Sequence, residues 1–119
     1  MQIKKSYSGV SPELLFHEVE DFVVKQGTVV DEANLETYSL PSDSSSFITR
    51  GTLTFKITDK SGNAGEECVR AHIVGSARGE TKLMFDINDQ LFPQEKVSAL
   101  EGDLDFIFSS YEQGKNDND

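Results

Sequence analysis

Hydrophobic and polar positions recur with two different periods along this chain, and the change of period separates helices from strands. Residues 2–8 alternate one by one, which predicts a short strand. From Ser11 and Pro12, which together form a typical helix start, apolar residues recur three and four positions apart as far as Gly27. This segment is therefore predicted to be an amphipathic helix whose stripe is formed by Leu15, Val19, Phe22 and Val23.

The middle of the chain predicts an antiparallel meander. Residues 28–40 contain one or two modest strands, and residues 41–46 form a polar run typical of a loop. The alternation is clean over residues 47–58, and two further strands are predicted over residues 66–74 and 81–88. Because the turns between these last three strands are short and contain glycine, neighbouring strands are expected to pair antiparallel.

A second amphipathic helix follows Pro93 and is expected to extend over about 18 residues. Phe106 lies off its apolar stripe, where it is an ordinary exposed side chain, a contact with a second chain, or a side chain packed under residues 28–46. Residues 113–119 are polar and predict a disordered acidic tail. The stripe itself consists of Val97, Leu100, Leu104, Ile107, Phe108 and Tyr111.

These elements predict a single α+β domain over residues 1–112. Its curved antiparallel sheet is expected to have about five or six strands, with the N-terminal helix and the long C-terminal helix packed on one face. A chain of 119 residues is long enough to bury a hydrophobic core without disulfides or structural metals.

Net charge excludes some classes of partner. The chain carries 21 acidic and 11 basic side chains, a net charge of −10. A field of this sign repels phosphate backbones and anionic membrane surfaces, so neither nucleic acid nor membrane is an expected partner. It favours solubility and permits docking on a basic protein partner.

Cysteine usage and the absence of sorting signals predict the compartment. The single cysteine, Cys68, allows no intramolecular disulfide, which is typical of a reducing environment. We find no signal peptide and no apolar run long enough for a membrane span, so a cytoplasmic location is expected.

Three groups of residues resemble chemical sites, but none predicts a catalytic or metal centre. Cys68, Arg70 and His72 alternate on one strand, but a thiol and an imidazole four residues apart lie about 13 Å from each other. His17 has acidic neighbours without a second histidine. Residues 86–89 resemble the start of a calcium loop that lacks its later glycine and glutamate. No cofactor is predicted.

The order of the elements resembles a known fold. The segment from Ser46 to Glu112 carries "SFITRGTLTFKI", "EECVRAHIVG", "ETKLMFDIND" and then the helix after Pro93. It resembles the helix-grip fold of the START-like superfamily and, more broadly, the TBP-like β-α-β4-α unit. This resemblance implies a sheet curled around the last helix, between which many members hold an apolar ligand. The chain is shorter than those members and has one N-terminal helix in place of a pair. A ferredoxin-like or other two-layer sandwich is the alternative.

Two functional hypotheses follow, since no residue motif transfers a function from that superfamily. The first is a module that binds a small apolar ligand between the sheet and the C-terminal helix. The second applies if the same residues close-pack into a dry core: a non-enzymatic protein-interaction module or homodimer. An enzyme ranks third, because no acid, base or nucleophile set can be named. The predicted ligand-binding residues are Phe47, Leu53, Phe55, Leu83, Phe85, Leu100, Leu104 and Phe108.

Overall fold

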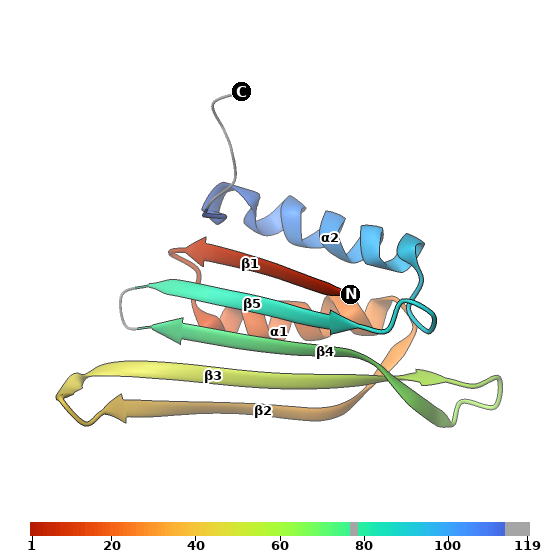
Figure 1. The fold of residues 1–119 in the computed structure, drawn as a ribbon, viewed down its shortest axis with the longest axis horizontal. Helices are drawn as coiled ribbons and strands as arrows, with labels where there is room; N and C mark the ends of the chain where they lie inside the picture. Colours follow the sequence, from red (N-terminus) through yellow and green to blue (C-terminus); the bar gives the residue numbers. More distant parts are fainter. Residues whose placement is uncertain (77–78, 114–119) are drawn as a thin grey trace.

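The computed structural model describes residues 1–76 and 79–113, without the side chains of residues 40 and 43–45. Within that part the strands form one antiparallel sheet in the order β1-β5-β4-β3-β2, with both helices on the same face (Figure 1). The predicted α+β class is therefore confirmed. The elements are β1 (Gln2–Ser8), α1 (Pro12–Lys25), β2 (Thr28–Leu40), β3 (Asp43–Thr58), β4 (Ala64–Ser76), β5 (Glu80–Ile87), α2 (Gln94–Phe108) and a 3₁₀ turn (Ser109–Tyr111).

The helix α1 lies directly on β3 and β4 because two glycines leave room for it. A β-carbon at Gly75 would lie within 2.8 Å of three ring atoms of Pro12. A β-carbon at Gly51 would lie 2.6 Å from a ring carbon of Phe16. The Oγ of Ser11 caps the start of the helix by accepting a hydrogen bond from the Leu14 amide at 3.0 Å. The helix cap therefore lies at Ser11, and the next residue, Pro12, rests on Gly75 of the sheet.

The helix α2 packs beside α1 and against β1. The ring of Phe108 lies 5.6 Å from that of Tyr7 in β1, centroid to centroid. Lys25 of α1 pairs with Asp103 of α2 at 3.2 Å. The largely buried amine of Lys5 lies 3.5 Å from Glu112, just beyond the helix. These contacts join the end of α2 to the first strand and the first helix.

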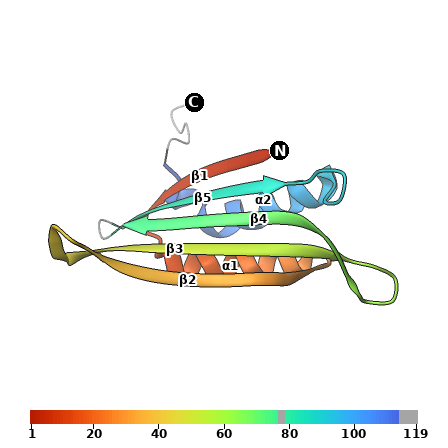
Figure 2. The same ribbon diagram turned by 60° about the horizontal axis from the view of Figure 1, so that its bottom comes forward.

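The strands β2 and β3 are longer than the sequence predicts. Residues 43–46 were expected to belong to a loop, but they begin β3, so the turn contains only residues 41–42. The hydroxyls of Thr37 and Thr49 lie 3.0 Å apart across the pair, and the pairing continues beyond them to Ser39 and Phe47. Cross-strand pairing therefore overrides the polar composition. Figure 2 shows this hairpin extending past the ends of β4 and β5.

The apolar stripe of α2 is narrower than predicted. Its buried side chains are Val97, Leu100, Leu104 and Phe108, and the helix ends at Phe108. Ile107 and Tyr111 were expected on the stripe, but both are exposed. The reason is geometric, because one helix resting on one sheet buries only the residues that share a single line along it.

The end of the described chain is held by β1. The amide of Gln113 donates to the carbonyl of Ser6 at 2.6 Å, and Glu112 forms an isolated bridge with Tyr7. Gln113 was expected to open a disordered tail. The rest of that predicted tail, residues 114–119, lies outside the described residues.

We expect Gly75→Ala to lower the free energy of unfolding by about 1–3 kcal/mol, because the new methyl must displace the ring of Pro12. Gly102→Ala is the matched control. Gly102 lies within α2 with nothing within 4 Å of an added β-carbon, so alanine there should raise stability by roughly 0.5–1 kcal/mol. Urea denaturation measures both. Equal effects at the two positions would contradict this account of how α1 is seated.

Candidate functional sites on the sheet

The interior between the sheet and the helices is filled by side chains. Seven of the eight residues predicted to bind a ligand are buried with at most 2% of their surface exposed, and they belong to one continuous core. The eighth, Phe47, is 45% exposed near the free end of the β2–β3 hairpin. The structure therefore brings seven of these residues together and leaves Phe47 apart. The seven are Leu53, Phe55, Leu83, Phe85, Leu100, Leu104 and Phe108.

Two hollows on the surface are large enough to accept a small molecule or a side chain. The first, of about 340 Å³, lies at the end of the sheet between the N-terminus and Cys68, and it includes Asp86 and Asn88. The second, of about 410 Å³, lies over β1, β5 and β4, on the face of the sheet that carries no helix. Neither is lined by a residue of α2. The predicted pocket between the sheet and α2 remains a prediction.

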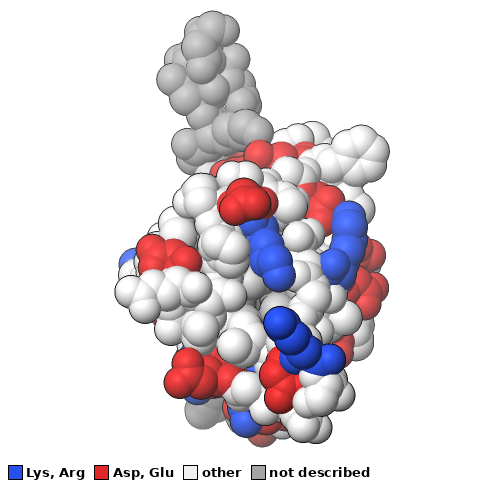
Figure 3. All heavy atoms as spheres, turned by 90° about the vertical axis from the view of Figure 1, so that its right-hand side faces the viewer, with Lys and Arg blue, Asp and Glu red and all other residues white. Residues whose placement is uncertain are grey.

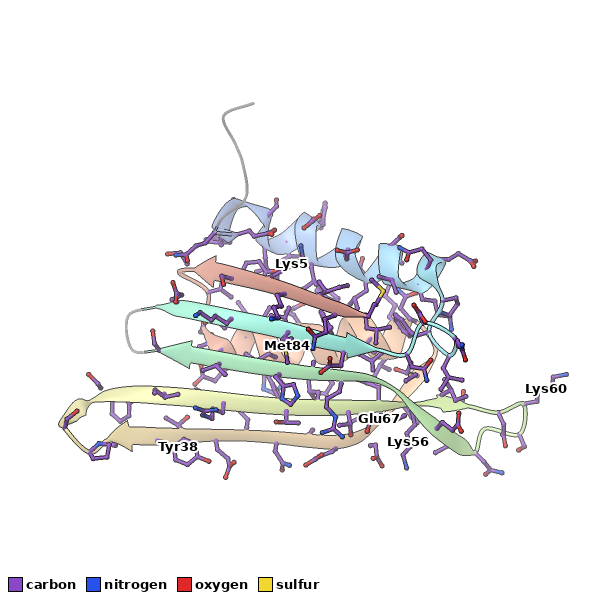
Figure 4. All side chains as sticks on the ribbon, in the orientation of Figure 1. Lys5, Tyr38, Lys56, Lys60, Glu67 and Met84 are labelled. Carbon is purple, nitrogen blue, oxygen red and sulfur yellow. The ribbon has the colours of Figure 1, made fainter. Side chains whose placement is uncertain are left out.

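Strand register defines the composition of the second hollow. In the β1–β5–β4 register, Lys4 and His72 flank Met84, while Ser6 and Val74 flank Lys82. These six side chains share the open face, because their neighbours along each strand point into the core. Met84 and Val74 are half-buried and give the hollow an apolar floor. Figure 1 looks onto this face, and Figure 4 labels Met84 near its middle.

Three basic side chains on the open face have no ion-pair partner among the described residues. Lys5, Lys25, Lys56 and Arg70 each pair with an acid. In contrast, Lys4, Lys82 and Arg50, all on the open face, have no such pair among the described residues. Each helix, on the other side of the sheet, carries four acids and one lysine. The sheet therefore separates an acidic face from a more basic one.

The end of the molecule that carries the β3–β4 turn has no such separation. Figure 3 views this end and shows acidic and basic side chains interspersed over it. In the turn itself Asp59 accepts hydrogen bonds from the backbone and hydroxyl of Ser61 and from the Asn63 amide, which lowers the pKa of its carboxyl. These contacts close the turn, so we assign it a structural role.

The two edges of the sheet differ in length and in cover. The edge strand β1 has seven residues, and its C-terminal end at Tyr7 is paired with Glu112. The edge strand β2 has 13 residues and pairs only with β3 among the described strands. Its register is regular from Glu32 to Ser39, between two irregularities. The outer edge of β2 is therefore a long, regular stretch of backbone without a neighbouring strand.

The strand β4 contains a bulge at Cys68. Phe55 pairs with Val69 and Lys56 pairs with Glu67, so Cys68 is an extra residue in β4. Simple alternation placed Cys68 on the same face as Arg70 and His72, but its side chain belongs to the core and lies 3.6 Å from the Phe55 carbonyl oxygen. Burial raises the pKa of the thiol. A protonated, buried thiol is a poor nucleophile, and the three residues form no catalytic group.

The other candidate chemistry also has structural explanations. His17 is exposed on α1, 4.0 Å from Glu20. Asn88 accepts a hydrogen bond from the Gln90 amide at 3.1 Å, as in an ordinary Asx turn, and Asp86 accepts one from Gln2. No group of three potential metal-ligating side chains occurs in the part of the chain that the structure describes.

Tyr7 and Lys5 form the most buried polar cluster. Burial, with Glu112 and Asp105 nearby, raises the pKa of the Tyr7 hydroxyl well above its usual value. The amine of Lys5 lies within 4 Å of both acids. Because the buried side chains of this cluster join β1 to α2 and to Glu112, we interpret it as structural.

Comparisons with protein-family models, with curated proteins and with solved structures gave no significant match. The helix-grip resemblance is therefore supported only at the level of an α+β fold with a five-stranded antiparallel sheet and two helices. In the described part of the chain no helix has both the length and the apolar character needed to span a membrane.

The open-face hollow was not identified from the sequence. Alternation does indicate that Lys82 and His72 point away from the core, but it does not reveal which residues of other strands lie beside them. The pairing of Lys4 with Met84 joins residues 80 positions apart. Only the register of distant strands brings them together.

We expect Phe85→Ala to cost about 3–5 kcal/mol of unfolding free energy, since Phe85 is fully buried in the core. Phe47→Ala should change stability by only about 0.5 kcal/mol or less, as is usual for a surface residue. Thermal and urea unfolding measure both variants. A small loss for Phe85→Ala would indicate spare room in the interior and would favour the internal ligand pocket.

We also expect the Cys68 thiol to react with a disulfide reagent such as DTNB only when the protein opens, because the side chain is 1% exposed and its pKa is raised. The measured rate near neutral pH should be far below that of the same protein in urea. A native rate equal to the unfolded rate would contradict the burial of Cys68.

Proposed function

We propose that this chain is a non-enzymatic protein-interaction module that takes a basic partner strand onto the free edge of β2. The observation that carries this proposal is the length of exposed, regular edge in β2, which no other described strand covers. An extended segment can join such an edge through backbone hydrogen bonds, as in β-strand addition.

The packed interior favours this proposal over an internal ligand. Seven of the eight residues that would line such a pocket already belong to the one continuous core, and Phe47 lies outside it. A close-packed core leaves little space for a guest without rearrangement of α2. A partner on the sheet edge requires no opening of the structure.

The chemistry of β2 selects the kind of partner. Asp31, Glu32 and Glu36 are exposed along this strand, which has no lysine and no proline. Natural proteins place charges on free edges to prevent unwanted pairing. Here the charges are all acidic, so two copies of the strand repel each other, whereas a strand with basic residues is attracted. The net charge of −10 acts in the same direction.

Each of these acids has a local contact, and these contacts lie away from the outer backbone edge of β2. Asp31 lies 3.4 Å from Lys56, and Glu32 accepts a hydrogen bond from Asn34. Glu36 lies opposite Arg50 in the β2–β3 register. It also accepts a hydrogen bond from the Tyr38 hydroxyl, which raises the pKa of that hydroxyl. None of these contacts occupies the outer backbone edge of β2.

The proposal is tested by titrating ¹⁵N-labelled protein with a short peptide that alternates lysine and valine. We expect amide shifts concentrated in residues 32–39 and weaker binding by the double variant Glu32→Gln/Glu36→Gln. Each lost cross-strand charge pair is worth about 0.2–1 kcal/mol, so the affinity should fall roughly 2- to 30-fold.

The matched control is the double variant Glu66→Gln/Asp89→Asn, which removes the same charge from exposed positions outside β2 and should bind as the unaltered protein does. A peptide that alternates glutamate and valine should not bind. An equal loss of peptide affinity in both double variants would show that net charge alone attracts the peptide and would overturn the role assigned to the β2 acids. Shifts located in the core or on α2 would overturn the assignment of β2.

A further inference from the structure

We propose that the hollow on the open face of the sheet binds a small anionic amphiphile, a free molecule with an apolar chain and one carboxylate or similar group. This site is separate from the edge of β2 and does not depend on the function proposed for it. The hollow has about 410 Å³, within the range of roughly 300–1,000 Å³ that small-molecule sites occupy.

The floor of the hollow suits an apolar chain. Met84 and Val74 lie diagonally on neighbouring strands, and both are half-buried on the open face. A methionine beside a branched side chain forms a deformable apolar surface, which can accept chains of varied shape. The side chain of His72 lies next to Met84 and extends this surface toward β3.

The rim of the hollow suits an anion. Lys4 is paired with Met84, and Lys82 lies two residues from Met84 on the same strand, so both amines are within side-chain reach of one bound head group. Arg50 lies one strand beyond Val74. Lys4, Lys82 and Arg50 have no ion-pair partner in the described part of the chain.

Acids border this rim without neutralising it. Glu80 shares the open face two residues before Lys82, Asp86 lies two residues after Met84, and Glu36 is paired with Arg50 at the far side. Asp86 is already bonded to Gln2 at 3.0 Å. In a chain with about twice as many acids as bases, two lysines without ion-pair partners line the hollow beside an apolar floor, with Arg50 one strand beyond, and they complement an anionic head group.

The choice of a free molecule over a lipid bilayer follows from the same charges. The helices and the chain as a whole are strongly acidic, which opposes approach to an anionic membrane. A single amphiphile reaches only the hollow and does not experience that wider repulsion to the same extent.

The experiment compares octanoate, octanol and acetate as probes of ¹⁵N-labelled protein. We expect octanoate to shift the amides of Val74, Lys82 and Met84, octanol to shift the same amides with weaker affinity, and acetate to shift none. If acetate reproduces the octanoate shifts, only adventitious anion binding is present and the proposal fails. It also fails if octanoate leaves these amides unchanged.

Variants separate the rim from the floor. Lys82→Gln should weaken octanoate binding roughly two- to fivefold, the scale of an exposed charge pair, and leave octanol binding unchanged. Met84→Gln keeps the length of the side chain but should weaken both probes. Lys60→Gln, in the β3–β4 turn, is the matched charge control and should weaken neither. Equal weakening of octanoate and octanol by Lys82→Gln would overturn the role assigned to the rim.

Discussion

At Gly51 and Gly75 the absence of a β-carbon lets Phe16 and Pro12 rest directly on β3 and β4. The other parts of the fold are arranged around this contact. It brings the apolar stripe of α1 onto the sheet, and α2 then fills the remaining width of the same face beside β1. With both helices on one side, the sheet is left with one packed face and one open face, which antiparallel sheets tolerate.

Because the helices cover only one face, the apolar core and the groups available for binding lie on different sides of the sheet. Seven of the eight residues predicted to enclose a ligand belong to the core, while basic side chains without ion-pair partners lie on the open face and unpaired backbone lies along the β2 edge. The two edges also differ, because residues 112–113 pair with the outer side of β1, whereas no described residue pairs with the outer side of β2. Any binding function of the described chain is therefore expected on the surface of the sheet.

Departures from regular alternation have local structural causes. The bulge at Cys68 moves one residue out of the pattern of β4 and places its thiol in the core, where burial keeps it protonated. The polar run after Pro41 enters β3 because the pairing of β2 with β3 continues past Thr37 and Thr49. In both cases contacts between strands outweigh the preference of the local sequence.

Hydrophobic periodicity alone predicted the two helices, most strand positions and the α+β class, because each of these depends on which side of a short segment is apolar. The cap at Ser11 and the inward-facing positions Leu53, Phe85 and Leu104 follow from the same local information, whereas the exposure of Phe106 was left open by the sequence. Only the tertiary structure decided the strand order, the bulge, the long β2–β3 hairpin and the pairing of Lys4 with Met84. These depend on register between residues far apart in the chain, and a single sequence contains no local signal for that register.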